Sequence, residues 1–97
     1  MSVTVRVPTI LRTYTDGVAE VAVDPSSAAS GATLAGVLEA LDAAAPGIRA
    51  RVVDEDGRLR RFVNVYVDDD DVRFLDGLQT PTPAGASISV IPAVAGG

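Results

Sequence analysis

Few residues in this chain have side chains that could carry out chemistry. The sequence has no cysteine and no histidine, so it lacks a thiolate nucleophile and the commonest general base and metal ligand near neutral pH. Lysine is also absent, and all eight cationic side chains are arginines, which stay protonated and are poor nucleophiles. We therefore predict no catalytic residue, no metal site and no bound cofactor, and we expect that the chain is not an enzyme.

Three short motifs resemble ligand-binding loops, but each departs from the pattern that its chemistry needs. Residues 31–36 have the glycine spacing of a phosphate-binding loop without the lysine that must follow it. Residues 54–57 are acidic, but their glycine comes fourth, whereas a calcium loop needs it sixth. Neighbouring side chains of the aspartate run 68–71 point in opposite directions on an extended chain. We interpret the last two motifs as solvated turns.

The one group left with a distinctive chemistry is the C-terminal carboxylate of Gly97. Pro92 removes a backbone amide and is predicted to end the last strand, so residues 93–97 are expected to form a flexible tail of Ala93, Val94, Ala95, Gly96 and Gly97. Fully extended, five residues reach roughly 16 Å. Because glycine has no Cβ, the Gly-Gly end fits a narrow channel in another protein. The alternative interpretation is an ordinary small-residue chain end.

The rest of the chain, residues 1–92, is predicted to be one domain that holds this tail. Residues 2–7 alternate valine with polar residues, and the apolar residues from Leu34 to Ala45 recur at helical spacing until Pro46-Gly47. We read 8–15 and 49–61 as loops. The predicted order is strand 2–7, strand 18–23, helix 34–45, and then strands 62–67, 72–74 and 87–91. This order predicts an α+β fold of the β-grasp, or ubiquitin-like, type. We expect one main helix on a mixed sheet of four to five strands, with the first and last strands parallel at its centre.

Aromatic residues mark a possible docking surface. The valines of the strand 62–67 are predicted to face the core, which leaves Phe62 and Tyr66 on the other face. Together with Phe74, these residues are our candidates for contact with partner proteins, because exposed apolar patches commonly mark such sites. A cross-strand stabilising pair explains the aromatic residues equally well.

Composition limits the class of partner and the location. The formal net charge of −5 argues against nucleic acid, which is bound by cationic side chains, and favours a basic protein partner. No apolar stretch has the length of a membrane span, and no signal peptide is expected at Met1. We therefore predict a cytoplasmic protein that does not bind membranes.

The chain resembles the MoaD/ThiS family of sulfur-carrier proteins, and within it the carriers of cysteine biosynthesis. The similarity lies in the segments 8–12, 61–67, 71–74 and 91–97, which read PTILR, RFVNVYV, DVRF and IPAVAGG. The resemblance implies that a ubiquitin-activating-like enzyme uses ATP to adenylate the Gly97 carboxylate and a sulfur donor to convert it to a thiocarboxylate. It further implies a PLP-dependent cysteine synthase that uses this sulfur, and a metal-dependent protease that releases cysteine from Gly97.

Three alternatives remain open at this stage. A MoaD-like small subunit of molybdopterin synthase would use the same tail but would hold a permanent large-subunit partner. A ubiquitin-like protein modifier would form conjugates of higher mass. A binding domain with an idle chain end would keep its activity without Gly96 and Gly97.

Overall fold

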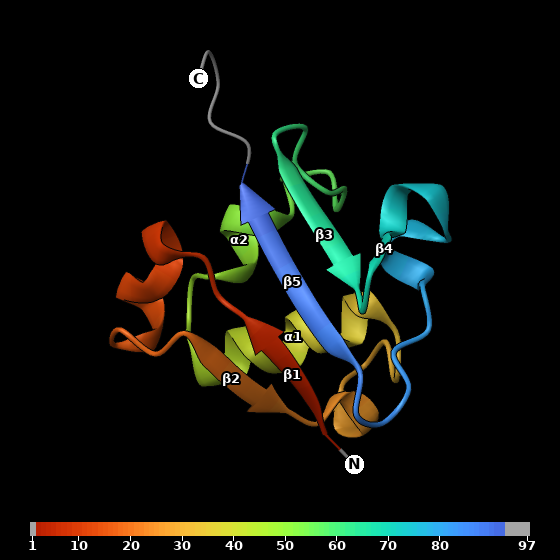
Figure 1. Cartoon of the computed structure of the whole chain (residues 1–97), viewed down its shortest axis with the longest axis horizontal. Helices are drawn as coiled ribbons and strands as arrows, with labels where there is room; N and C mark the ends of the chain where they lie inside the picture. The colour runs from red at the N-terminus through yellow and green to blue at the C-terminus, as the bar shows by residue number, and fades with distance from the viewer. Residues whose placement is uncertain (1, 93–97) are drawn as a thin grey trace.

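The computed structural model describes residues 2–92 and shows a five-stranded sheet packed on one main helix (Figure 1). The strands are β1 (Val3–Arg6), β2 (Glu20–Val23), β3 (Val63–Val67), β4 (Asp70–Asp71) and β5 (Ser87–Pro92). Their order across the sheet is β2-β1-β5-β3-β4. This is the β-grasp arrangement that the sequence predicts.

Strand β5 lies at the centre of the sheet and is paired on both sides. It runs parallel to β1, with Val5 opposite Ile88, and antiparallel to β3, with Val65 opposite Val90. The expected parallel pairing of the first and last strands is therefore confirmed. Bonding on both edges fixes the position of β5 more firmly than that of an edge strand.

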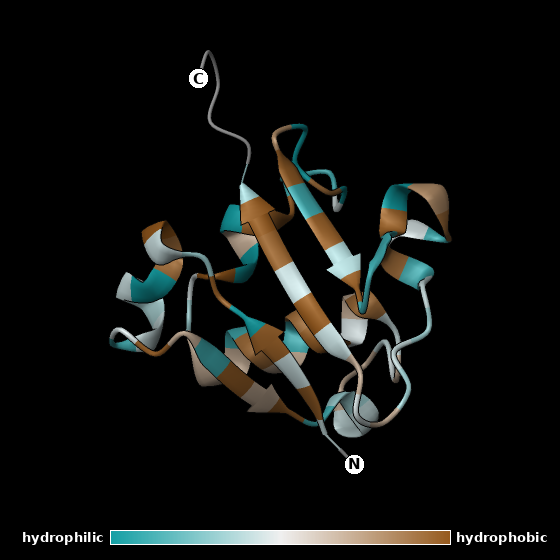
Figure 2. Ribbon diagram, in the orientation of Figure 1, coloured by the Kyte–Doolittle hydropathy of each residue, from teal (hydrophilic) through white to brown (hydrophobic). Residues whose placement is uncertain are grey.

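Helix α1 (Leu34–Ala44) covers one face of this sheet. Thr33 caps it, because its hydroxyl accepts a hydrogen bond from the amide of Gly36 at 3.3 Å. The apolar side of the helix packs on the inward-facing residues of the strands, whose alternation is visible in Figure 2. The largest fully buried side chains of this core are those of Leu34, Leu38, Leu41, Ile48, Ile88, Val3, Val5, Val37, Val52, Val65 and Val72.

Two segments predicted as loops contain helical turns. Residues 8–15 form a 3₁₀ helix, η1 (Thr9–Thr15), which brings Leu11 into the core. Residues 49–61 begin with α2 (Arg49–Val52), whose Val52 is also buried. Each turn is too short to show helical periodicity, and each is held by the burial of apolar side chains rather than by local propensity.

The strand predicted at 72–74 is wrong. The strand that pairs with β3 is β4, at Asp70–Asp71, and residues 72–74 form the 3₁₀ helix η3 (Val72–Phe74). The cause is local: the carboxylate of Asp71 accepts a hydrogen bond from the amide of Arg73 at 2.9 Å, which starts a helical turn. The shorter 3₁₀ helices η2 (Pro25–Ser27) and η4 (Gly77–Gln79) complete the elements. Within residues 2–92, none of the helices has the length and apolar character needed to cross a bilayer.

Candidate functional site

The candidate site begins where the described part of β5 ends. Ile91 and Pro92 pair with Asn64 and Val63 of β3, so the strand is held up to its last described residue. The predicted tail residues, namely Ala93, Val94, Ala95, Gly96 and Gly97, lie outside the described residues. The fold thus defines the point on the central strand from which the tail continues.

The three aromatic candidates for docking do not share one surface. Tyr66 is half-buried on the outward face of β3, opposite Ser89 of β5. Phe62, 54% exposed, lies just before β3, and Asn64 separates it from Tyr66 on the same face. Phe74 is 87% exposed but belongs to η3, outside the sheet. The helical turn at η3, which the sequence analysis missed, is the reason for this separation.

Ile91 is a surface residue that the sequence analysis did not single out. Its side chain is 49% exposed, and together with Tyr66 and Ser89 it lines a shallow depression on the outward face of the sheet. The strand alternation contains the signal, because Ile88 and Val90 are buried and Ile91 must therefore point outward. An apolar patch of Tyr66 and Ile91, bordered by Asp68 and Asp69 of the same depression, thus lies beside the exit of the tail.

A groove with two cations flanks the other side of the same strand end. It is lined by Arg6, Arg12 and Glu20 together with residues 89–92 of β5, and Glu20 lies 3.9 Å from Arg6. The Nε group of Arg12 donates to the carbonyl oxygen of Val7 at 3.0 Å, which holds that side chain against the turn between β1 and η1. The exit of the tail is therefore bordered on one side by Tyr66 and Ile91 and on the other by two arginines, of which Arg6 is paired with Glu20.

Arg73 connects the segment around Phe62 to η3, and no sequence motif indicated this role. One of its terminal nitrogens donates to the main-chain carbonyls of Arg60 at 2.8 Å, Arg61 at 3.2 Å and Val63 at 2.8 Å. The other donates to the side-chain oxygen of Asn64. The planar, multiply donating guanidinium suits such a cluster of acceptors. This contact fixes the chain on both sides of Phe62.

The carboxylates that the sequence brings together have structural roles. Asp54 accepts hydrogen bonds from the amides of Asp56 and Arg58, at 2.9 and 3.0 Å, and so closes the 54–57 turn. Asp68 accepts from the amide of Ser87 at 3.1 Å. In the part of the chain that the structure describes, no group of three or more potential acidic or histidine ligands is arranged to hold a metal ion.

Comparison with known proteins places these features in a family. The profile of the ThiS family matches residues 5–97. The sulfur carrier protein CysO of Mycobacterium tuberculosis is 48% identical over 99 residues, which cover 100% of both chains. Small archaeal modifier protein 3 of Haloferax volcanii is 41% identical over 66 residues, covering 68% of this chain and 71% of that protein. A chain in the crystal structure of the Amycolatopsis orientalis BexX/CysO complex has a TM-score of 0.86 and 44% identity, with 98% of this chain and 99% of that chain covered.

Proposed function

This chain belongs to the ThiS family, and we propose that it is a sulfur carrier whose Gly97 carboxylate is converted to a thiocarboxylate for cysteine biosynthesis. The observation that carries the proposal is the 48% identity to a sulfur carrier protein, CysO, over the whole of both chains. The relatives reported above are carriers and modifiers by name, which agrees with a protein that partner enzymes act on.

The proposed chemistry takes place at the end of the tail and is performed by partners. In the first step a carboxylate oxygen of Gly97 attacks the α-phosphorus of ATP, and pyrophosphate leaves. A sulfur donor then displaces AMP from the acyl adenylate, which yields the thiocarboxylate. A PLP-dependent cysteine synthase would take up this sulfur, and a metal-dependent protease would release the cysteine formed on Gly97. The sequence offers no lysine that could intercept the activated carbonyl, because an arginine guanidinium stays protonated.

The body contributes position and recognition. Strand β5 is paired on both sides, so the tail begins at a fixed point of the sheet. We propose that the activating enzyme docks on the patch of Tyr66 and Ile91 beside this exit, with Phe62 and Phe74 as outlying contacts. An apolar patch at this place would let the partner align the tail with its own active site at a small entropic cost. In the complex named above, the CysO chain is crystallised with a partner protein, BexX.

Intact mass spectrometry tests the proposal. The purified chain is incubated with ATP, a ubiquitin-activating-like enzyme encoded in the same genome, and sulfide. We expect the mass to rise by the difference between a sulfur and an oxygen atom, and we expect no change in a matched variant that lacks Gly97. An unmodified mass in the presence of an enzyme that hydrolyses ATP on addition of the chain would refute the thiocarboxylate. The same spectrum verifies that the chain ends at Gly97.

Docking is tested separately by two charge substitutions. Tyr66→Asp is expected to weaken binding to the activating enzyme at least about tenfold, since a buried unpaired charge costs more than a lost apolar contact. Val18→Asp is the control, because Val18 is a partly exposed apolar side chain, 49% exposed, that lies just before β2 at the opposite edge of the sheet from β3. Equal affinities of the two variants in calorimetry would remove the patch from the proposal while leaving the tail chemistry in place.

A second candidate function is protein modification. The similarity to small archaeal modifier protein 3, at 41% identity over 66 residues, favours it. A modifier would appear in cell lysate as conjugates of higher mass that react with an antibody to the chain, and these would disappear when Gly97 is deleted. A carrier would be recovered mainly as the free protein.

A further inference from the structure

Strand β2 has an edge that the rest of the fold leaves unpaired. It is the first strand in the order β2-β1-β5-β3-β4, and it pairs only with β1 among residues 2–92. Its antiparallel register places Val5 opposite Val21 and Arg6 opposite Glu20. An open strand edge presents main-chain groups that can pair with another extended chain.

The hydrogen bonds of the β1-β2 ladder show which main-chain groups face this edge. The amide of Val7 donates to the carbonyl of Ala19 at 2.7 Å, so residues 19, 21 and 23 direct their main-chain groups toward β1. Glu20 and Ala22 therefore direct an amide and a carbonyl each away from the sheet. Their side chains lie on the outward face, since those of Val21 and Val23 point toward the core.

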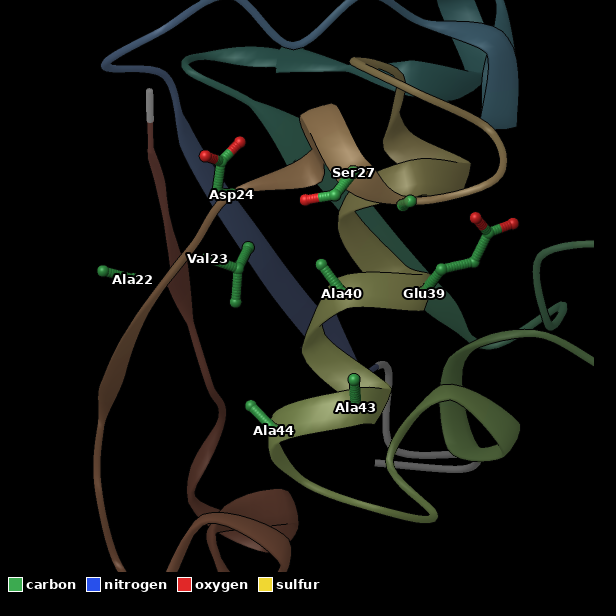
Figure 3. A pocket seen from close by; sticks show the side chains of 9 residues that line it. Ala22, Val23, Asp24, Ser27, Glu39, Ala40, Ala43 and Ala44 are labelled. Atoms are coloured by element: carbon green, nitrogen blue, oxygen red, sulfur yellow. The ribbon is translucent and has the colours of Figure 1, made fainter.

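A groove runs beside this edge, between β2 and α1. It consists of two adjoining depressions of about 420 and 350 Å³, which share Ala22 and Ala44 in their walls. Figure 3 shows Val23 turned toward the helix, and Ala40 and Ala44 on the side of α1 that faces β2. Because the helix carries alanines here, a space remains that longer side chains would fill. An added strand on β2 would place every second side chain over these alanines.

The rim of the groove is acidic. Asp24 and Glu39 line the first depression, Asp16 and Glu20 line the second, and no arginine is among the residues that line either one. Hydrogen bonds from Ser26 lower the pKa of Asp24 to about 2, so this carboxylate is charged under physiological conditions. The ion pair of Glu20 with Arg6 is long, at 3.9 Å, and exposed. The unpaired edge, the small apolar wall and the negative rim all lie along one strand.

We propose that the outer edge of β2 is a docking site for an extended, basic segment of a partner protein that adds to the sheet as a sixth strand. In this arrangement the main-chain groups of Glu20 and Ala22 hydrogen-bond to the segment. Its small apolar residues lie over Ala40 and Ala44, and its alternate cationic residues lie beside Glu20. A second copy of the chain does not supply the required cations, because residues 18–24 contain no lysine or arginine. Antiparallel pairing of two β2 strands centred on Ala22 would in addition place Glu20 of one copy opposite Asp24 of the other, and like charges in that position repel.

This site is separate from the surface proposed for activation. The strands β3 and β5, which carry Tyr66 and Ile91, lie beyond β1 from the open edge of β2. A partner on β2 therefore leaves the exit of the tail accessible. The proposal does not depend on the thiocarboxylate, and its test uses no activating enzyme.

The test is an NMR titration of the full chain with a synthetic heptapeptide that alternates lysine and valine. We expect shift changes at residues 18–24 and on the alanine side of α1, together with slower hydrogen exchange at the amide of Ala22. Methylating every main-chain amide of the peptide removes its donors whether the added strand is parallel or antiparallel to β2, and is expected to weaken binding. A peptide that alternates glutamate and valine is expected not to bind. Equal binding of the methylated peptide would overturn the proposal in favour of a diffuse charge interaction.

Substitutions on the protein make the test specific to the strand edge. Ala22→Pro removes the outward amide, and proline is tolerated where an edge amide faces solvent. We expect affinity for the lysine peptide to fall at least about fivefold, the loss expected for one hydrogen bond. Ala22→Thr keeps the amide and is expected to keep the affinity. Melting curves establish that both variants are folded.

Charge reversal supplies an independent result. Glu20→Lys is expected to weaken binding of the lysine peptide and to strengthen binding of the glutamate peptide. This result does not depend on the effect of Ala22→Pro. Shift changes confined to Tyr66 and Ile91, or no changes at millimolar peptide, would overturn the proposal. Protein self-association through β2 on simple concentration, seen in the same amides, would assign the edge to a second copy instead.

Discussion

Replacing Arg73 should loosen the segment around Phe62 and lower the stability of the whole domain. The guanidinium donates to three main-chain carbonyls and to the side chain of Asn64. The carbonyls of Arg60 and Arg61 are exposed, and water can replace the donor there. The carbonyl of Val63 is partly buried, so water replaces the lost hydrogen bond less completely there. The Nη2 group has two hydrogens for three carbonyls, and Nη1 donates one to Asn64, so three hydrogens are engaged. At the lower end of the usual value for each hydrogen bond, they contribute about 1.5 kcal/mol.

Urea denaturation and thermal melting of Arg73→Ala measure this effect. For a domain of this size, about 1.5 kcal/mol corresponds to a melting temperature lower by roughly 6–12 °C. Arg73→Lys should recover less than half of the loss, because an ammonium group cannot reach several planar acceptors together. Arg58→Ala is the matched control. It removes the same charge, and within residues 2–92 the Arg58 side chain has no hydrogen bond or ion pair. If Arg73→Ala and Arg58→Ala differ by less than about 0.5 kcal/mol, the network adds nothing beyond an ordinary surface charge.

Two further substitutions test how α1 is joined to the segment before it. Gly36→Ala would place a Cβ only 1.7 Å from the carbonyl oxygen of Gly31, so the main chain must move, and we expect a loss of about 3 kcal/mol in urea denaturation. The control Ala43→Gly, at an exposed position of the same helix, should lower the free energy of unfolding by only about 0.5–1 kcal/mol. Similar losses for Gly36→Ala and Ala43→Gly would contradict the predicted clash. Hydrogen bonds from the hydroxyl and amide of Ser30 lower the pKa of Glu39 below its ordinary value of 4.5, so its ionised form stabilises the fold. Glu39→Gln should therefore reduce the melting temperature at neutral pH. The difference in melting temperature between this variant and the unmodified chain should disappear as the pH falls below 4.5. If the difference persists at low pH, the charge of Glu39 is not the cause of the stabilisation.

The sequence predicts those elements in which the spacing of apolar residues alone determines whether the segment is a strand or a helix. The strands around Val65 and Ile88 alternate strictly, and helix α1 has a capping Thr33 and a regular apolar face. Side-chain burial and main-chain hydrogen bonding favour the same structure in these elements. The parallel pairing of β1 and β5 followed from the order of the elements and the need to cover one face with a single helix.

The elements that the sequence did not reveal depend on contacts between distant residues. Helix α2 forms because Val52 is buried against the rest of the core, although its four residues have no periodicity of their own. At η3 a side-chain cap from Asp71 overrides the β propensity of Val72 and Phe74. The role of Arg73 depends on carbonyls about ten residues away in sequence, which no local motif records. The aromatic surface was consequently predicted as one patch, whereas the structure divides it.

The division of the surface has a consequence for how partners can approach. Tyr66 and Ile91 lie on the outward face of the sheet, where β3 and β5 pair, while Phe74 belongs to η3, which Arg73 joins to Val63 and Asn64 of β3. A partner that contacts all three must therefore extend from the sheet onto η3, whereas one that contacts only Tyr66 and Ile91 can remain close to the end of β5. The second geometry keeps the contact surface close to Pro92, the last residue that the structure describes before the segment that ends in Gly97. For this reason we expect Tyr66, rather than the more exposed Phe74, to dominate the affinity for an enzyme that acts on the tail.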